Sequence, residues 1–163
     1  MHPIFMAPVH ETILQDSILI RSPIDRVFAL STNVELVHQT LGFKPFPASG
    51  RVSFGSRVHW KGWLFGLPQS HHTLITAFDP PHFFQDSQEA GRFAHFHHDH
   101  HFTETPEGTL LRDEVHFALP FGALGALVAK HLLEPHVQRL LRARFQLLKH
   151  VAEDPNEAWR KYT

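Results

Sequence analysis

The order of apolar patterns along the chain constrains the fold more than any other feature. Between Val52 and Leu119, short β-branched and aromatic segments are separated by Gly and Pro breaks, which is typical of antiparallel strands. From Phe121 to about Glu153, apolar residues recur at helical spacing instead. A run of strands followed by one long amphipathic helix predicts an α+β protein whose sheet packs on that helix.

The N-terminal part of the sequence adds one strand and two short helices. The segment from about Glu11 to Arg21 is expected to form the first strand, and Ser22 to cap the helix that follows. A second helix is expected from Asn33 to about Leu41, ending at Gly42. Residues 43–50 contain two prolines and no periodicity, so we expect a loop there.

These elements predict a single domain covering residues 1–163, with a core from about residue 11 to residue 153. About six or seven antiparallel strands cannot bury one face alone, so the sheet is expected to curl around the long C-terminal helix and leave a cavity there. Pro135 lies inside the helical pattern and predicts a kink or break. Arg139, Arg142 and Arg144 are expected on the solvated face of this helix.

Composition excludes several classes of partner and site. The net charge of -1 gives no excess of positive charge that would attract a phosphate backbone, so we expect no nucleic-acid partner. The chain has no cysteine, and therefore no disulfide, thiolate zinc site or cysteine nucleophile. The start, from Met1 to Pro8, lacks the pattern of an export signal, and no apolar run is long enough for a membrane span. The sequence predicts a cytoplasmic protein and leaves its oligomeric state open.

Several local motifs carry a family resemblance that covers about Glu11 to Val151. They are Ile20-Arg21-Ser22-Pro23, Gly66-Leu67-Pro68, Phe78-Asp79-Pro80-Pro81-His82-Phe83 followed by Asp86, Gly91-Arg92-Phe93 followed by His98, His100 and Phe102, and Leu119-Pro120 followed by Gly122. With this order of elements, the chain resembles the START/Bet v 1-like (SRPBCC) superfamily, in particular its bacterial ligand-binding and polyketide cyclase/dehydrase-like branch. The resemblance implies a helix-grip fold with a ligand cavity. It implies no particular reaction, because members include lipid carriers, hormone receptors and aromatase/cyclases.

A histidine-rich segment, from about Phe93 to Glu104, is the most unusual part of the sequence. With a side-chain period of 2, one face carries Phe96, His98, His100 and Phe102, and the other carries His95, His97, Asp99 and His101. The phenylalanines, and the resemblance, place the first face inward. The outer face has ligand types suited to zinc or nickel, but such a spacing arises easily by chance in a chain with 16 histidines. We therefore expect a solvated strand face there, and neither a metal nor a cofactor.

This segment and the next, from Thr109 to Leu119, are expected to form a hairpin with a four-residue loop. Counting across the loop places Phe102 opposite Leu111, His100 opposite Asp113, His98 opposite Val115 and Phe96 opposite Phe117. Asp113 would then lie on the apolar face, where a buried carboxylate needs a partner, and the register provides His100. The pair either orients an imidazole for proton transfer or only satisfies two buried polar groups.

Two functions fit these features. The first is binding of a small hydrophobic or aromatic molecule between the sheet and the C-terminal helix. The residues expected to contact it are Trp60, Phe96, His98, His100, Phe102, Val115, Phe117, Leu124 and Val128. Trp63 has the opposite parity to Trp60, so at most one of them faces the cavity. The alternative is a polyketide cyclase/dehydratase-like enzyme that uses His100, Asp113 and His98 as general acid and base.

Overall fold

The computed structural model describes residues 10–163, so the N-terminal segment from Met1 to Pro8 lies outside the described residues. The strands of the described part form one seven-stranded antiparallel sheet in the order β1-β7-β6-β5-β4-β3-β2. The strands are β1 (Thr12–Ile20), β2 (Phe43–Phe46), β3 (Arg57–Leu64), β4 (Leu67–Asp79), β5 (Phe83–Ala90), β6 (His95–Thr105) and β7 (Gly108–Ala118). The helices are α1 (Ile24–Ser31), α2 (Val34–Leu41), α3 (Gly122–Val128), the π-helical η1 (Ala129–Leu133), α4 (Glu134–Ala152) and the 3-10 helix η2 (Ala158–Lys161).

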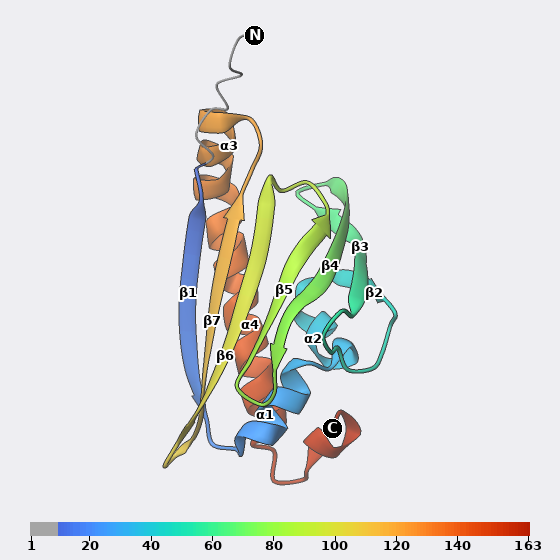
Figure 1. The fold of residues 1–163 in the computed structure, drawn as a ribbon, viewed down its shortest axis with the longest axis vertical. Helices are drawn as coiled ribbons and strands as arrows, with labels where there is room; N and C mark the ends of the chain where they lie inside the picture. Colours follow the sequence, from blue (N-terminus) through green and yellow to red (C-terminus); the bar gives the residue numbers. More distant parts are fainter. Residues whose placement is uncertain (1–9) are drawn as a thin grey trace.

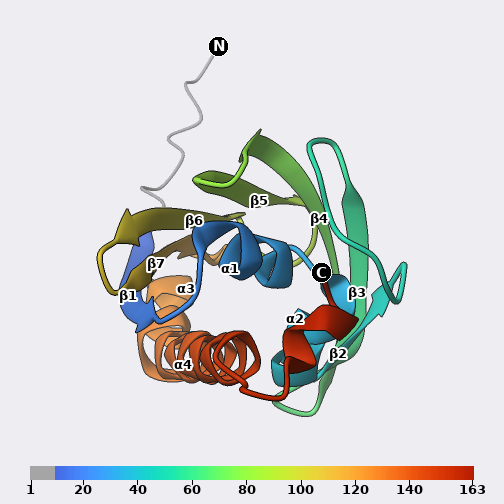
Figure 2. The same cartoon turned by 90° about the horizontal axis from the view of Figure 1, so that it is seen from below.

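The sheet curves around α4, as predicted, and the short helices α1 and α2 pack against α4 inside the curve (Figures 1 and 2). This arrangement is the helix-grip fold, and the predicted fold class is confirmed. None of the described helices combines the length and the apolar character needed to cross a membrane.

Two local expectations in the N-terminal half are wrong. The segment after α2 is not a loop throughout, because Phe43–Phe46 pairs with β3 as the edge strand β2. An edge position tolerates Pro45, which has no backbone N–H to donate. Ser22 does not cap α1: the N-cap is Pro23, and the Ser22 hydroxyl is buried without a hydrogen-bond partner in the described structure. The expected start of α2 is confirmed, since the Asn33 side chain accepts from the backbone N–H of Leu36 at 2.9 Å.

The C-terminal helix is interrupted where Pro135 predicts a break. Helix α4 begins at Glu134, so Pro135 lies in its first turn, directly after a π-helical turn, and the backbone stays right-handed helical through Leu133 and Glu134. The five residues before it, Ala129–Leu133, form the π-helical turn η1 that joins α3 to α4. The amphipathic stretch is therefore a continuous helical run with a π-helical irregularity before Pro135 rather than one uniform α-helix.

The β6–β7 hairpin has the predicted register. His100 pairs with Asp113, His98 with Val115 and Phe96 with Phe117. The connection is shorter than expected, because Thr105 and Gly108 already form a strand pair and only Pro106 and Glu107 remain between them. Gly108 has φ +139°, and a Cβ atom there would lie 2.2 Å from the carbonyl oxygen of Ile20. The alternation of side chains along β6 consequently has the phase inferred from the sequence.

Candidate functional site

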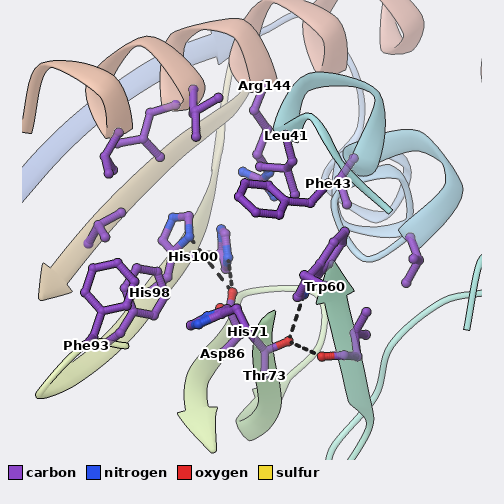
Figure 3. Close-up of a pocket in the computed structure, with 18 of the residues that line it drawn as sticks. Leu41, Phe43, Trp60, His71, Thr73, Asp86, Phe93, His98, His100 and Arg144 are labelled. Atoms are coloured by element: carbon purple, nitrogen blue, oxygen red, sulfur yellow. Dashed lines mark hydrogen bonds and ion pairs between the residues drawn. The ribbon is translucent and has the colours of Figure 1, made fainter. Parts of the chain in front are cut away.

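A cavity of about 260 Å³ lies between the concave face of the sheet and the helices α2 and α4. Its wall is mainly apolar and aromatic, and Figure 3 shows Leu41, Phe43, Trp60 and Phe93 around the space. Helix α4 contributes Val137, Leu140 and Leu141. The curvature of the sheet separates these side chains enough that they enclose a space instead of filling it.

The structure places the residues predicted to line the cavity in three different surroundings. The first group lines the cavity as predicted and consists of Trp60, Phe96, His98, His100 and Val115. Trp63 is 70% exposed, in keeping with the opposite parity of the two tryptophans.

Phe102 and Phe117 point inward as expected, but they are buried in the packed core and are not part of the cavity wall. The expectation for Leu124 and Val128 is wrong, because they are 66% and 36% exposed and do not line the cavity. They belong to α3, which precedes the π-helical turn and lies at one end of the sheet (Figure 1), and none of the α3 residues is part of the cavity wall.

The Asp113 carboxylate is fully buried and holds the polar part of the site together. His100 Nδ1 lies 2.9 Å from Asp113 Oδ1, so the structure brings the expected pair into hydrogen-bond distance. Arg144 Nη1 donates to Asp113 Oδ2 at 2.6 Å, and Arg144 Nη2 to the backbone oxygen of Ser31 at 3.5 Å. Asp113 itself is not part of the cavity wall, so it acts on the cavity only through its neighbours.

Asp86 and Arg144 are the site residues that sequence reasoning missed. Arg144 is buried, not solvated, and lies among Leu141, Phe145 and Leu148 on the apolar face of α4. A cation within an apolar helical stripe is a signal for a buried carboxylate elsewhere. Asp86 pairs with His98 in the β5–β6 register, and its Oδ2 lies 3.1 Å from His100 Nε2. Both nitrogens of His100 thus face carboxylates.

The two inward imidazoles lie against one another, with ring centroids 3.8 Å apart and planes tilted by 40°. His98 Nε2 is 3.3 Å from Asp113 Oδ2, within ion-pair range, but the angles are not those of a hydrogen bond, and Nε2 has no hydrogen-bond partner in the described part of the chain. His98 Nδ1 is 3.9 Å from Asp86 Oδ2. Figure 3 shows both rings directed toward Asp86.

Burial and neighbouring charges shift the pKa values of His98, His100 and Asp113 in different directions. Burial alone would lower the pKa of His100, but the Asp113 and Asp86 carboxylates outweigh it and raise that pKa. Burial lowers the pKa of His98, and the charge of His100 lowers it further. Burial opposes ionisation of Asp113, yet the Arg144 guanidinium and the neighbouring imidazoles hold the pKa of its carboxyl well below the usual range. These directions favour a charged His100 beside a neutral His98.

The outer face of β6 carries a second histidine cluster. The rings of His97 and His116 stack at 4.3 Å, and His116 Nε2 lies 2.6 Å from Glu114 Oε1. Glu11 Oε1 lies 3.4 Å from His116 Nδ1. His97, Asp99 and His116 have ligand atoms within 4.8 Å of one another. The imidazole of His116 is thus already paired with two carboxylates.

We expect His116 to titrate above the ordinary histidine pKa of about 6.5. Burial is the largest single influence and lowers the pKa of His116, but the hydrogen bond to Glu114 and the charges of Glu11 and Glu114 together outweigh it and raise that pKa. The folded chain then binds more protons than the unfolded chain, so this contribution to stability is complete below about pH 6.5 and is lost as the pH rises through the raised pKa. An NMR titration of the imidazole resonances should show a lower pKa in Glu114→Gln and no change in Glu107→Gln. An unchanged pKa in Glu114→Gln would contradict the assignment.

The fold of the described residues has counterparts among known proteins. A curved antiparallel sheet that grips a C-terminal helix is the fold shared with solved Bet v 1-like and START structures. No protein-family profile and no curated protein sequence matches the chain.

Solved structures of other proteins have the same architecture. The structure of TTHA0849 from Thermus thermophilus is similar at 18% identity, with a TM-score of 0.66 over 84% of this chain and 97% of that one. Truncated norcoclaurine synthase from Thalictrum flavum is similar at 11% identity, with a TM-score of 0.67 over 93% and 99% of the two chains. A START superfamily protein from Mycobacterium smegmatis is similar at 12% identity, with a TM-score of 0.65 over 85% and 97%. At these identities the likeness shows the fold alone.

Proposed function

We propose that the protein binds a small hydrophobic or aromatic molecule in the cavity between the sheet and α4. The observation that carries this proposal is the apolar, aromatic-walled cavity itself. Its volume of about 260 Å³ lies just below the range of about 300–1,000 Å³ common for small-molecule sites, which favours a compact ligand. Burial of the ligand's apolar surface would supply the affinity.

The polar cluster supports a preference for ligands with one oxygen-bearing end. His98, His100 and Asp86 line the same cavity, while most of the remaining wall is apolar. A ligand that is polar at one end would place that end at the imidazoles and its flat apolar part against residues such as Trp60 and Phe93. A wholly apolar ligand would offer no partner to the buried nitrogens His71 Nδ1 and His98 Nε2, which have no hydrogen bond in the described structure, and an unpaired buried polar group costs free energy.

The alternative function is that of a cyclase/dehydratase-like enzyme. It is favoured by one specific observation, namely that the two imidazoles open on the cavity while a fully buried carboxylate holds one of them. His98 would accept a proton from a carbon next to a carbonyl group, and His100 would donate one from Nε2 to the departing oxygen, which would replace Asp86 as the partner of that nitrogen. The solved neighbours include a norcoclaurine synthase point mutant in complex with a transition-state analogue, so this architecture also occurs in a protein named as a synthase.

Ligand binding is tested by native mass spectrometry of the purified protein and by titration with a fluorescent naphthalene probe. Leu140→Trp adds bulk inside the cavity and should weaken probe binding at least about 10-fold, or about 1.4 kcal/mol. The control is Leu132→Trp on η1, because Leu132 is 49% exposed and does not line the cavity. Equal probe affinity in both variants would mean that the probe binds elsewhere, and the proposal would fail.

The enzymatic alternative needs a separate measurement. Polyketone substrates would be incubated with the protein and with His100→Gln and Asp113→Asn variants whose folding has been verified by circular dichroism. The alternative predicts cyclised or dehydrated product with the natural protein and at least about 100-fold slower turnover in each variant. Turnover that survives both substitutions would exclude the assigned acid–base roles and leave the binding proposal in place.

A further inference from the structure

The side chains of Asp86, His98 and His100 converge at one point of the cavity wall. The ligand-type atoms of these residues lie within 4.8 Å of one another. Asp86 Oδ2 is 3.1 Å from His100 Nε2 and 3.9 Å from His98 Nδ1. In a tetrahedral zinc site with bonds of about 2.0–2.1 Å, neighbouring ligand atoms are about 3.3–3.4 Å apart. The observed separations lie on either side of that value.

In each of the two imidazoles, the ring nitrogen that does not face Asp86 lies close to the Asp113 carboxylate. His100 Nδ1 is 2.9 Å and His98 Nε2 is 3.3 Å from the Asp113 oxygens. Arg144 holds Asp113 from the opposite side at 2.6 Å. Histidines that ligate metals almost always present their second nitrogen to a carboxylate, carbonyl or water, which sets the tautomer and the ring orientation. The described side chains therefore provide an outer shell as well as three inner ligands.

The charges of the side chains around Asp86, His98 and His100 also favour a bound cation. Among the described side chains in direct contact here, the two carboxylates of Asp86 and Asp113 face one permanent cation, the Arg144 guanidinium. With neutral imidazoles, one negative charge is left in a largely buried place, which is costly. A proton on His100 or a metal ion between the imidazoles and Asp86 would neutralise it, and the two would compete.

A further imidazole and the cavity complete the surroundings. His71 lines the same cavity next to Asp86 (Figure 3), and its Nδ1 is buried with no hydrogen-bond partner in the described structure. The outer cluster of His97, Asp99 and His116 offers similar donors, but His116 Nε2 is already bonded to Glu114 and no buried guanidinium anchors that cluster in the described part of the chain. The inner cluster is therefore the better candidate.

We propose that Asp86, His98 and His100 bind a divalent first-row transition metal ion such as Zn²⁺ on the cavity wall. Asp113 and Arg144 act as its outer shell, and a fourth position is open to water or to an oxygen of a bound ligand. Three protein ligands with an open position are typical of zinc sites that act on substrates. This inference goes beyond the proposed ligand binding, which depends only on the apolar wall.

The test uses Co²⁺ as a spectroscopic probe on chelator-treated full-length protein, followed by displacement with Zn²⁺. The natural protein should bind one equivalent with the visible absorption of a four- or five-coordinate Co²⁺ site. Asp86→Asn and His98→Ala should each weaken this binding at least about 100-fold, and Asp113→Asn about 10- to 100-fold. The double variant His97→Ala/His116→Ala removes the outer cluster and should bind Co²⁺ like the natural protein.

Folding of each variant is verified by circular dichroism, and Asp86→Asn, which preserves side-chain shape, decides the matter if His98→Ala does not fold. Absence of stoichiometric Co²⁺ binding by the natural protein would overturn the inference. So would binding that survives Asp86→Asn and disappears in the outer-cluster variant. The fluorescent probe is titrated in parallel, so that a protein that binds the probe and no metal separates this failure from a failure of the proposed function.

Discussion

Replacing Arg144 by Met is expected to destabilise the protein by about 3–5 kcal/mol, a loss typical of breaking a buried ion pair from one side. Methionine approximates the arginine stem in length, so little packing is lost. The substitution removes the guanidinium that donates to Asp113 at 2.6 Å, although that carboxylate is fully buried. Asp113 would then be left with imidazoles alone as partners. Urea unfolding at neutral pH measures the loss.

The matched control for this prediction lies two residues away on the same helix. Arg142 has a 66% exposed side chain and a longer contact of 3.5 Å with Asp16. Arg142→Met should therefore change the free energy of unfolding by no more than about 0.5 kcal/mol. Arg144→Lys keeps the charge without the planar donor pair and should fall between the two. Similar losses in Arg144→Met and Arg142→Met would show that the buried pair contributes no more than a surface contact.

Replacing Phe28 by Ala is expected to cost about 3–5 kcal/mol, because the vacated volume lies inside a cluster of aromatic rings. The Phe28 ring is 5.4 Å from Phe78, 5.8 Å from Phe84 and 5.1 Å from Phe102, each in an edge-to-face arrangement. This cluster joins α1 to three strands of the sheet. Loss of the ring removes apolar burial and three aromatic contacts at once.

Phe54 provides the control of the same residue type, since it is 71% exposed. Phe54→Ala should change the free energy of unfolding by no more than about 0.5 kcal/mol. Thermal and urea unfolding of the two variants, compared under the same conditions, test the difference. A loss below about 1 kcal/mol for Phe28→Ala would mean that the neighbouring rings collapse into the space, and the aromatic cluster would not be the anchor of α1.

The same packing explains why the cavity and the charged cluster occur together. Phe84 stacks on His100 with centroids 4.1 Å apart, so the aromatic core holds the imidazole from the side. On another side, Asp113 lies 2.9 Å from His100 Nδ1 and is itself held by the Arg144 guanidinium. His100 is only 3% exposed but still lines the cavity. A polar group fixed in this way meets a ligand without first losing conformational freedom, which favours binding and catalysis alike.

Much of the architecture was predictable because it depends on local patterns. Strand alternation, the turn after Thr105 and the cap at Asn33 act over a few residues, and they sufficed for the β6–β7 register and for the pairing of His100 with Asp113. A connection of two residues and one of four residues give the same β6–β7 pairing here. The error in the predicted turn length therefore did not change which face of β6 points inward.

Local patterns did not predict the residues that helix α4 and strand β5 contribute to the site. Arg144 shares its helix with exposed arginines, and only its position within the apolar stripe set it apart. Asp86 reaches His100 through pairing between neighbouring strands. Leu124 and Val128 continue the apolar pattern of the C-terminal stretch, but the π-helical turn carries α3 to the end of the sheet, where those side chains are exposed.

By itself, the amino-acid sequence determined most of the segments that become strands and helices, with the edge strand β2 as the exception, which face of β6 points inward, and that Asp113 requires a buried partner. Those features follow from side-chain periodicity and from the cost of burying an unpaired charge. Only the tertiary structure decided that Asp86 and Arg144 complete the cluster, and that Phe102 and Phe117 fill the core while Val115 borders the cavity. The curvature of the sheet and the placement of α4 set those distances, and both arise from packing between residues far apart in the chain.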